Sequence, residues 1–320
     1  MTRALELIPL VLGAESGGKM ADPVAHVVNH PAVWNESGLW LWSAHMGNLV
    51  LSGLLLVLVM SWAARHISTK PSAAGADKYI TRNPLAHMIE VICVFLRDQT
   101  VRPLLGERTD RFMPFLWTLF FFILINNLLG LVPLMDLQHL VSPELRRSHT
   151  AWVGGTATQS LFVTGVLALI AFVVVNVAGI RELGLKGYLR HLTGGAPVFI
   201  WPILVPVEVM GIFIRPVALA LRLFANMTAG HILVATLLIF AGVGVTRLAG
   251  GGGLDIALGG TITLLSFVAT IAIMFLELFV AFLQAFVFMF LTTVFISQLS
   301  HHGDHEHEHH GAPGHEHAHA

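Results

Sequence analysis

Charged residues are scarce in this chain of 320 residues. Asp, Glu, Lys and Arg together make up 12% of it, whereas hydrophobic residues make up 55% and the mean hydropathy is +0.74. Soluble globular proteins contain about 25% charged residues, so this composition excludes an ordinary soluble domain. The formal net charge of −1 gives no reason to expect a basic surface for nucleic acid. We therefore expect a protein that lies in membrane lipid and binds no nucleic acid.

Cysteine and the common catalytic motifs are almost absent as well. The single cysteine, Cys93, cannot form a disulfide within the chain and is expected to be packing material. The glycine-rich stretch Gly250–Gly253 is followed by no Gly-Lys-Ser/Thr, and neither His-Glu-x-x-His nor Gly-x-Ser-x-Gly occurs. These absences argue against a phosphate-binding loop and an intramembrane hydrolase. No catalytic residue, cofactor or dedicated metal site is expected, and the chain is not expected to be an enzyme.

Long apolar runs are what the sequence has instead. Several charge-free stretches reach the length of about 20 residues that a helix needs to cross a bilayer. They are Ser37–Ala64, Phe112–Met135, Ser148–Ile180, Leu223–Thr246, Ile256–Leu276 and Leu278–Gly303. These runs predict an all-α integral membrane protein with about five membrane-crossing helices. The glycines at 250–253 predict a turn between the last two long helices, which then form an antiparallel hairpin.

One further apolar stretch, Pro84–Leu105, carries charges at regular intervals. Glu90, Arg97, Asp98 and Arg102 all lie within it. This is too polar for a free crossing and is typical of a helix that lies along the membrane surface. We therefore predict an interfacial helix on the cytoplasmic side.

The distribution of Lys and Arg predicts the orientation of the chain. Most of them lie in the loop after the first span and in the loop between the third and fourth spans, which the positive-inside rule places in the cytoplasm. The N-terminus is then outside and the C-terminus cytoplasmic. The residues are Arg65, Lys70, Lys78, Arg82, Arg97, Arg102, Arg108, Arg111, Arg181, Lys186 and Arg190.

Three regions are expected along the chain. Residues 1–39 are predicted to be a polar N-terminal leader on the outside, and residues 40–300 the membrane domain. Residues 301–320 form a tail rich in His and Glu, whose composition predicts disorder in the cytoplasm. Such a tail can bind metal incidentally, because neutral imidazoles on a flexible chain suffice.

Polar residues inside the apolar runs are the candidates for function. A charged side chain at the centre of a spanning helix costs about 2.5–3.5 kcal/mol, so each one requires a partner or a role. One apolar segment contains Glu208, Arg215, Arg222, Asn226 and His231, and the last helix contains Glu277 and Gln284.

Helical spacing indicates which of these side chains act together. Glu208, Arg215 and Arg222 follow one another at intervals of seven residues, so they lie along one stripe. In an antiparallel hairpin Glu277 can face His231, and Gln284 can approach Arg222. Arginine stays protonated and acts as a fixed charge, whereas His231 and Glu277 can gain and lose protons. Arg215 either extends its charge toward water or pairs with Glu208, and Asn226 can equally be a contact between helices.

The sequence of these segments resembles that of subunit a of the F-type ATP synthases. Residues 215–231 read RPVALALRLFANMTAGH, and Glu277 is followed by LQAFVF at 283–288 and by Leu291 and Thr292. Asn126 and Asn127, with GLVP at 130–133, also look familiar, and the likeness covers residues 49–299. Two features depart from the family pattern: GTATQS at 155–160 stands where many members carry Asp and Asn, and the histidine-rich tail is not a family feature.

This resemblance implies a stator subunit that conducts ions through two aqueous half-channels. The implied partners are a c-ring of small hairpin subunits, which the last two helices face, the peripheral stalk subunit b and, through them, the soluble ATPase head. The implied location is a bacterial-type inner membrane. Arg222 would face the c-ring carboxylate and separate the half-channels. Residues at the other polar positions would provide ion access: Asn226, His231, Glu277, Gln284 and Glu208.

Two questions stay open at the level of the sequence. The ion is H⁺ or Na⁺, because its selection would reside mainly in the c-ring. The alternative function is a standalone secondary transporter for ions or metals, with Glu208, Glu277 and His231 as ligands. Arg222 among these side chains argues against a cation site.

Overall fold

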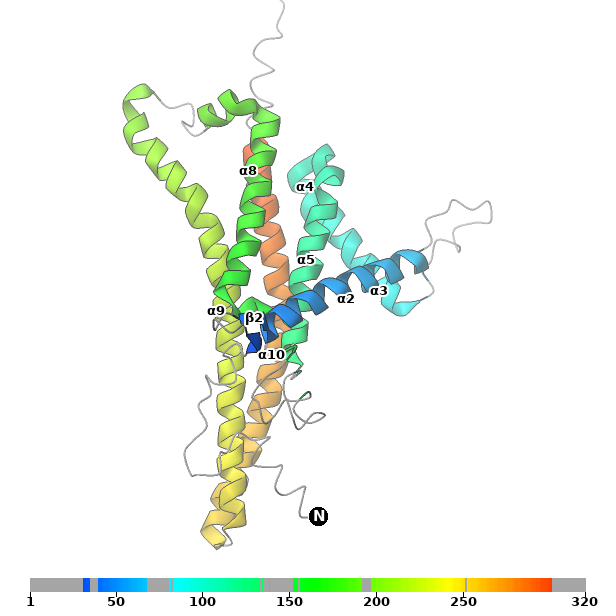
Figure 1. Cartoon of the computed structure of the whole chain (residues 1–320), viewed down its shortest axis with the longest axis vertical. Helices are drawn as coiled ribbons and strands as arrows, with labels where there is room; N and C mark the ends of the chain where they lie inside the picture. Colours follow the sequence, from blue (N-terminus) through cyan, green and yellow to red (C-terminus); the bar gives the residue numbers. More distant parts are fainter. Residues whose placement is uncertain are drawn as a thin grey trace, which may run out of the picture. The chain divides into compact units, whose positions relative to one another are not determined.

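The computed structural model describes residues 31–34, 40–67, 81, 83–132, 134, 138, 152–154, 156–191, 197–250 and 252–300. Five of its helical stretches are long and apolar enough to cross a membrane, which confirms the predicted all-α membrane fold (Figure 1). The predicted leader and tail lie outside the described residues, apart from 31–34. The division into leader, membrane domain and tail stays a prediction.

The elements follow one another with short connections. A two-stranded antiparallel sheet, β1 (Pro31–Trp34) and β2 (Trp40–Ser43), precedes the first long helix. The helices are α2 (Ala44–His66), α3 (Pro84–Val94), α4 (Arg102–Leu105), α5 (Thr109–Leu131), α8 (Leu161–His191), α9 (Trp201–Ala249) and α10 (Gly253–Ser300). Shorter pieces are a π-helical segment, Phe95–Val101, and single 3-10 turns at Gly106–Arg108, Ala157–Gln159 and Val198–Ile200.

Several helix bounds differ from the predicted ones. Helix α9 runs unbroken over 49 residues and α10 over 48 residues, because neither Pro206 and Pro216 nor the single charge of Glu277 ends a helix. Helix α8 begins at Leu161 rather than at Ser148, since residues 152–160 are not α-helical. The predicted interfacial helix is interrupted: it consists of α3, the π-helical segment and α4, and ends at Gly106, whose φ of 55° favours glycine.

The chain divides into two compact units. Unit 1 contains Met1–Trp62, Phe120–Thr164 and Leu221–Phe286, and unit 2 contains Ala63–Leu119, Gly165–Ala220 and Val287–Ala320. Helices α5, α8, α9 and α10 each contribute residues to both units.

In unit 1, α9 and α10 form the predicted hairpin. A Cβ atom added to Gly244 of α9 would lie 2.8 Å from the backbone nitrogen of Thr263 and 2.9 Å from the carbonyl oxygen of Gly259. The two backbones therefore pack closer than side chains would allow, which is the usual role of glycine between membrane helices. The hairpin is the yellow-to-orange pair in Figure 1.

Unit 1 also holds a segment of irregular backbone, residues 152–160, against its helices. The Nε1–H of Trp42 donates to the carbonyl oxygen of Trp152 at 3.0 Å, and the amide of Gly154 donates to the carbonyl oxygen of Ala44 at 3.3 Å. The Gln138 amide nitrogen donates to the carbonyl oxygen of Val153. Non-helical backbone at membrane depth is tolerated only where protein or water satisfies its polar groups. These bonds supply part of that requirement and fix the segment in place.

In unit 2, α3 and α5 pack against each other as a second hairpin. The Arg97 guanidinium pairs with Asp110 at 2.8 Å, and the Nε1–H of Trp117 donates to the carbonyl oxygen of Cys93 at 3.3 Å. The hydroxyl of Ser297 on α10 donates to the carbonyl oxygen of Leu104 at 2.8 Å. The last turns of α10 are thereby attached to this hairpin.

Candidate functional site

Arg222 lies on α9 within unit 1, and its side chain is exposed. Among the residues that the structure describes, no Asp or Glu forms an ion pair with it. One turn further along α9, the exposed Asn226 donates from Nδ2 to Oε1 of Gln284 at 3.1 Å. The predicted approach of Gln284 to this part of α9 is therefore found, with Asn226 as its hydrogen-bonding partner.

Gln284 itself is almost completely buried in α10. Its side chain is 3% exposed, and within the described part of the chain its Nε2 has no hydrogen-bond partner. A buried amide that leaves a donor unsatisfied costs about 1–3 kcal/mol. This donor is thus available to a water molecule or to a group from another subunit.

His231 follows Asn226 along α9 and bonds to the irregular segment. Its Nε2 lies 2.9 Å from Oγ1 of Thr156, whose side chain is fully buried. Thr156 packs directly on Gly130 of α5: a Cβ atom added there would lie 1.8 Å from Thr156 Oγ1. The glycine therefore makes room for the hydroxyl that holds the imidazole.

Glu277 of α10 lies beside the turn of α9 that carries His231. A Cβ atom added to Gly230 would lie 2.2 Å from Oε1 of Glu277. The spacing argument brings Glu277 to this turn, as the hairpin predicts. The hydrogen bond described for His231 is to Thr156, and its pairing with Glu277 stays a prediction.

A second buried contact joins the irregular segment to two helices. The hydroxyl of Thr158 donates to Oδ1 of Asn127 at 2.9 Å, and Nδ2 of Asn127 donates to the carbonyl oxygen of Ala281 at 3.2 Å. Asn127 and Thr158 are both fully buried. Thr156 and Thr158 were not predicted as site residues; the departure of residues 155–160 from the family pattern was the one signal that pointed to them.

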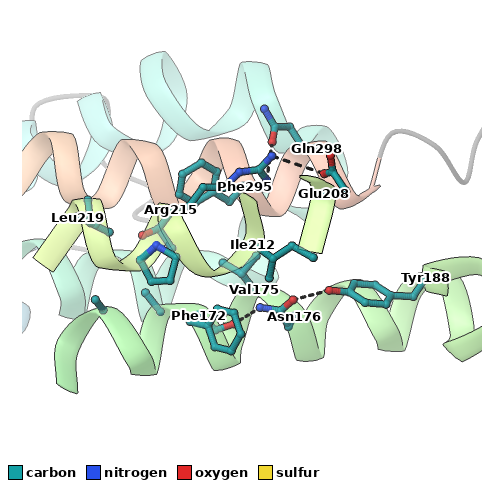
Figure 2. Close-up of a pocket in the computed structure, with 14 residues that line it drawn as sticks. Phe172, Val175, Asn176, Tyr188, Glu208, Ile212, Arg215, Leu219, Phe295 and Gln298 are labelled. Atoms are coloured by element: carbon teal, nitrogen blue, oxygen red, sulfur yellow. Dashed lines mark hydrogen bonds and ion pairs between the residues drawn. The ribbon is translucent and has the colours of Figure 1, made fainter. Parts of the chain in front are cut away.

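Unit 2 contains a separate polar group around Arg215. Its guanidinium lies 3.7 Å from Oε1 of Glu208, donates to Oε1 of Gln298 at 3.3 Å, and lies 5.3 Å from the ring centre of Phe295 (Figure 2). The pairing of Arg215 with Glu208, left open by the sequence, is thus found. Glu208 belongs to unit 2, whereas the other five predicted site residues belong to unit 1.

These side chains line a cavity of about 60 Å³ within unit 2. Its walls are mostly apolar, and its polar groups come from α8, α9 and α10. They are Asn176, Tyr188, Glu208, Arg215, Thr292 and Gln298. A water molecule needs about 10–15 Å³ by this measure, so the cavity has room for roughly four.

The far wall of the cavity is closed by a hydrogen-bonded pair on α8. The Tyr188 hydroxyl donates to Oδ1 of Asn176, whose Nδ2 donates to the carbonyl oxygen of Phe172 at 2.7 Å (Figure 2). Burial raises the pKa of Tyr188 above its ordinary value, while the charge of Arg215 lowers it. The hydroxyl is therefore neutral at physiological pH.

Metal binding is not indicated by the side chains that the structure describes. In that part of the chain no group of three or more His, Cys, Asp and Glu residues could hold a metal ion.

Comparison with known proteins gives a consistent result. Residues 46–297 match the family described as ATP synthase A chain. The chain is 43% identical over 265 residues to ATP synthase subunit a of Myxococcus xanthus (strain DK1622), covering 81% of this chain and 74% of that protein. It is 37% identical over 296 residues to the subunit a of Anaeromyxobacter dehalogenans (strain 2CP-1 / ATCC BAA-258), covering 87% and 68%. The subunit a of Chloroherpeton thalassium (strain ATCC 35110 / GB-78) is 35% identical over 298 residues, covering 90% and 79%.

Proposed function

This chain belongs to the ATP synthase A chain family, and from that premise we propose that Arg222 is the fixed charge at the centre of its ion path. As a member of the family it is a multi-pass membrane protein and a non-catalytic subunit of the ATP synthase complex that translocates ions through the membrane sector. Family membership does not favour the alternative of a standalone transporter.

The environment of Arg222 is the observation that carries the proposal. An exposed guanidinium on a membrane-crossing helix would face hydrocarbon at a cost of about 2.5–3.5 kcal/mol or more. Because the described residues offer it no carboxylate, a partner from another subunit is required. The carboxylate of a rotating c-ring subunit is such a partner. At an effective dielectric of ~20, two opposite charges about 4 Å apart attract by about 4 kcal/mol, which is enough to ionise a buried acid.

The polar side chains of unit 1 support one half of the path. His231 and Glu277 can accept and release protons, and Thr156 holds the imidazole at one ring nitrogen. Asn226 and Gln284 lie on the same hairpin, and Gln284 keeps one amide donor for water or for the ring. In the proposed sequence of events, a proton reaches the ring carboxylate through these groups and neutralises it. The neutral subunit can then enter the lipid.

Glu208 and the cavity of unit 2 support the other half of the path. A carboxylate paired with Arg215 at the edge of a water-sized cavity can exchange protons with that water. A ring carboxylate that returns to Arg222 releases its proton, which leaves by this cavity. Each elementary charge that crosses 100 mV supplies about 2.3 kcal/mol, so several crossings drive the synthesis of one ATP.

The partners and the orientation follow from the same proposal. The hairpin of α9 and α10 would face the c-ring, and subunit b of the peripheral stalk would hold the chain against the soluble head. The Lys and Arg residues of the loops predict an external N-terminus and a cytoplasmic C-terminus in a bacterial-type inner membrane. The cavity near the end of α8 would then open toward the cytoplasm.

Replacing Arg222 with Ala in the assembled complex tests this function. We expect ATP-driven proton pumping into membrane vesicles to be abolished while the complex still assembles, because the ring carboxylate loses its counter-charge. Passive proton leak is expected to rise. Arg247→Ala is the matched control, since it removes an exposed arginine from the last turn of the same helix. Normal pumping by Arg222→Ala would refute the proposed function.

A further inference from the structure

The fold of α8 brings together two residues that a straight helix would keep apart. Asn176 and Tyr188 are twelve residues apart in sequence, which corresponds to about 18 Å along a regular α-helix. Their side chains nevertheless share a hydrogen bond. The chain reverses between them at Gly184, whose φ of 69° and ψ of 164° lie in a region that glycine alone occupies readily. This turn places the tyrosine over the cavity of unit 2.

The hydrogen bonds of the pair fix what Tyr188 can still do. Its proton is donated to Asn176, and Asn176 is held by the carbonyl oxygen of Phe172. A phenolic oxygen that has donated its proton keeps its acceptor capacity. That oxygen therefore offers a fixed acceptor to a water molecule in the cavity, without itself gaining or losing a proton.

Glu208 and Arg215 line the same cavity, and both interact electrostatically with Tyr188. The rest of the lining is largely apolar, so a water chain in it has few groups to orient it. Thr292 also lines the cavity, but its hydroxyl is bonded to its own helix at the carbonyl oxygen of Phe288, at 2.8 Å. Tyr188 is thus positioned, as Thr292 is not, by a purpose-built contact from another turn of the chain.

We propose that Tyr188, returned by the turn at Gly184 and held by Asn176, is a positioning residue that orients the water through which Glu208 exchanges protons. The inference rests on the proposed function, because it assigns the cavity of unit 2 to the ion path. Tyr188 takes part in no covalent step, and the proton moves between water and the Glu208 carboxylate.

The test uses the complete complex in membrane vesicles and compares three substitutions. Tyr188→Phe keeps the ring and removes the hydroxyl, and we expect passive proton conduction and ATP-driven pumping to fall about three- to tenfold, as for the loss of one hydrogen bond. Thr292→Val removes a different hydroxyl from the same cavity and is expected to change both by less than about twofold. Asn176→Leu leaves the tyrosine unsupported and should reproduce part of the loss.

A double substitution separates positioning from mere packing. If Tyr188 acts through water at Glu208, then Tyr188→Phe should cost nothing further in a Glu208→Gln background. An equal loss in both backgrounds, or an equal effect of Thr292→Val, would overturn the inference. Should Tyr188→Phe fail to assemble, Asn176→Leu decides, and unchanged conduction in that variant would overturn it as well. Arg222→Ala is measured alongside: if it pumps normally, the proposed function fails, whereas its failure to pump beside a normal Tyr188→Phe rejects only this inference.

Discussion

The polar groups of the two units are held in different ways. In unit 1, Thr156, Thr158 and Asn127 are fully buried, and each bonds to another segment of the chain. In unit 2, Glu208 and Arg215 are one-third exposed or more and lie at a cavity large enough for water. A path through fixed buried partners is selective but depends on every bond, whereas a path through water tolerates small displacements. Substitutions in unit 1 should therefore be more damaging than comparable ones in unit 2.

The largest effect is expected from Thr156→Val, which removes a buried hydroxyl without changing the size of the side chain. His231 would lose the partner at its Nε2 in surroundings that exclude water. We expect proton pumping to fall about ten- to hundredfold, because an unsatisfied buried polar group costs about 1–3 kcal/mol. Thr156→Ser retains the hydroxyl and should keep most of the activity. Pumping by the valine variant at the normal rate would show that this bond is not part of the path.

A smaller effect is expected from Gly184→Ala in unit 2. Alanine at a φ of 69° and a ψ of 164° costs about 1–3 kcal/mol, so the turn would open and Tyr188 would leave Asn176. Vesicle pumping should fall to about the level of Tyr188→Phe. Gly165→Ala in the same helix is the control, since an added Cβ has no atom within 4 Å there. An identical result for both glycines would remove the turn from the explanation.

The sequence predicts the helices and most of the intramembrane polar residues because these depend on local, periodic signals. Apolar length gives the crossings, and the antiparallel hairpin gives the contact between Asn226 and Gln284. Spacing by seven residues also allows the pair of Glu208 and Arg215. Charge in an apolar run is conspicuous, and its neighbours on a helix follow from geometry.

The sequence does not predict the partners that non-helical backbone supplies. Thr156 lies in an irregular segment and has an uncharged side chain of ordinary polarity, so neither periodicity nor charge marks it. The contact of Tyr188 with Asn176 depends on one backbone angle at Gly184, and many glycines in membrane helices have no such angle. Both misses arise where the chain departs from a regular helix.

The smallest effect is expected from Phe295→Leu, which removes the ring facing the Arg215 guanidinium. A cation–π contact at a partly exposed site contributes about 0.5–1 kcal/mol, and Arg215 would keep its contacts with Glu208 and Gln298. Vesicle pumping should stay within about twofold of the normal rate. Phe172→Leu serves as the control, because that ring stacks on Phe213 instead of on a charge. If Phe295→Leu impaired pumping as severely as Thr156→Val, the cavity of unit 2 would depend on fixed contacts as strictly as unit 1 does. The exchange of protons at Glu208 would then require a single geometry of Arg215, and water alone would not explain its tolerance.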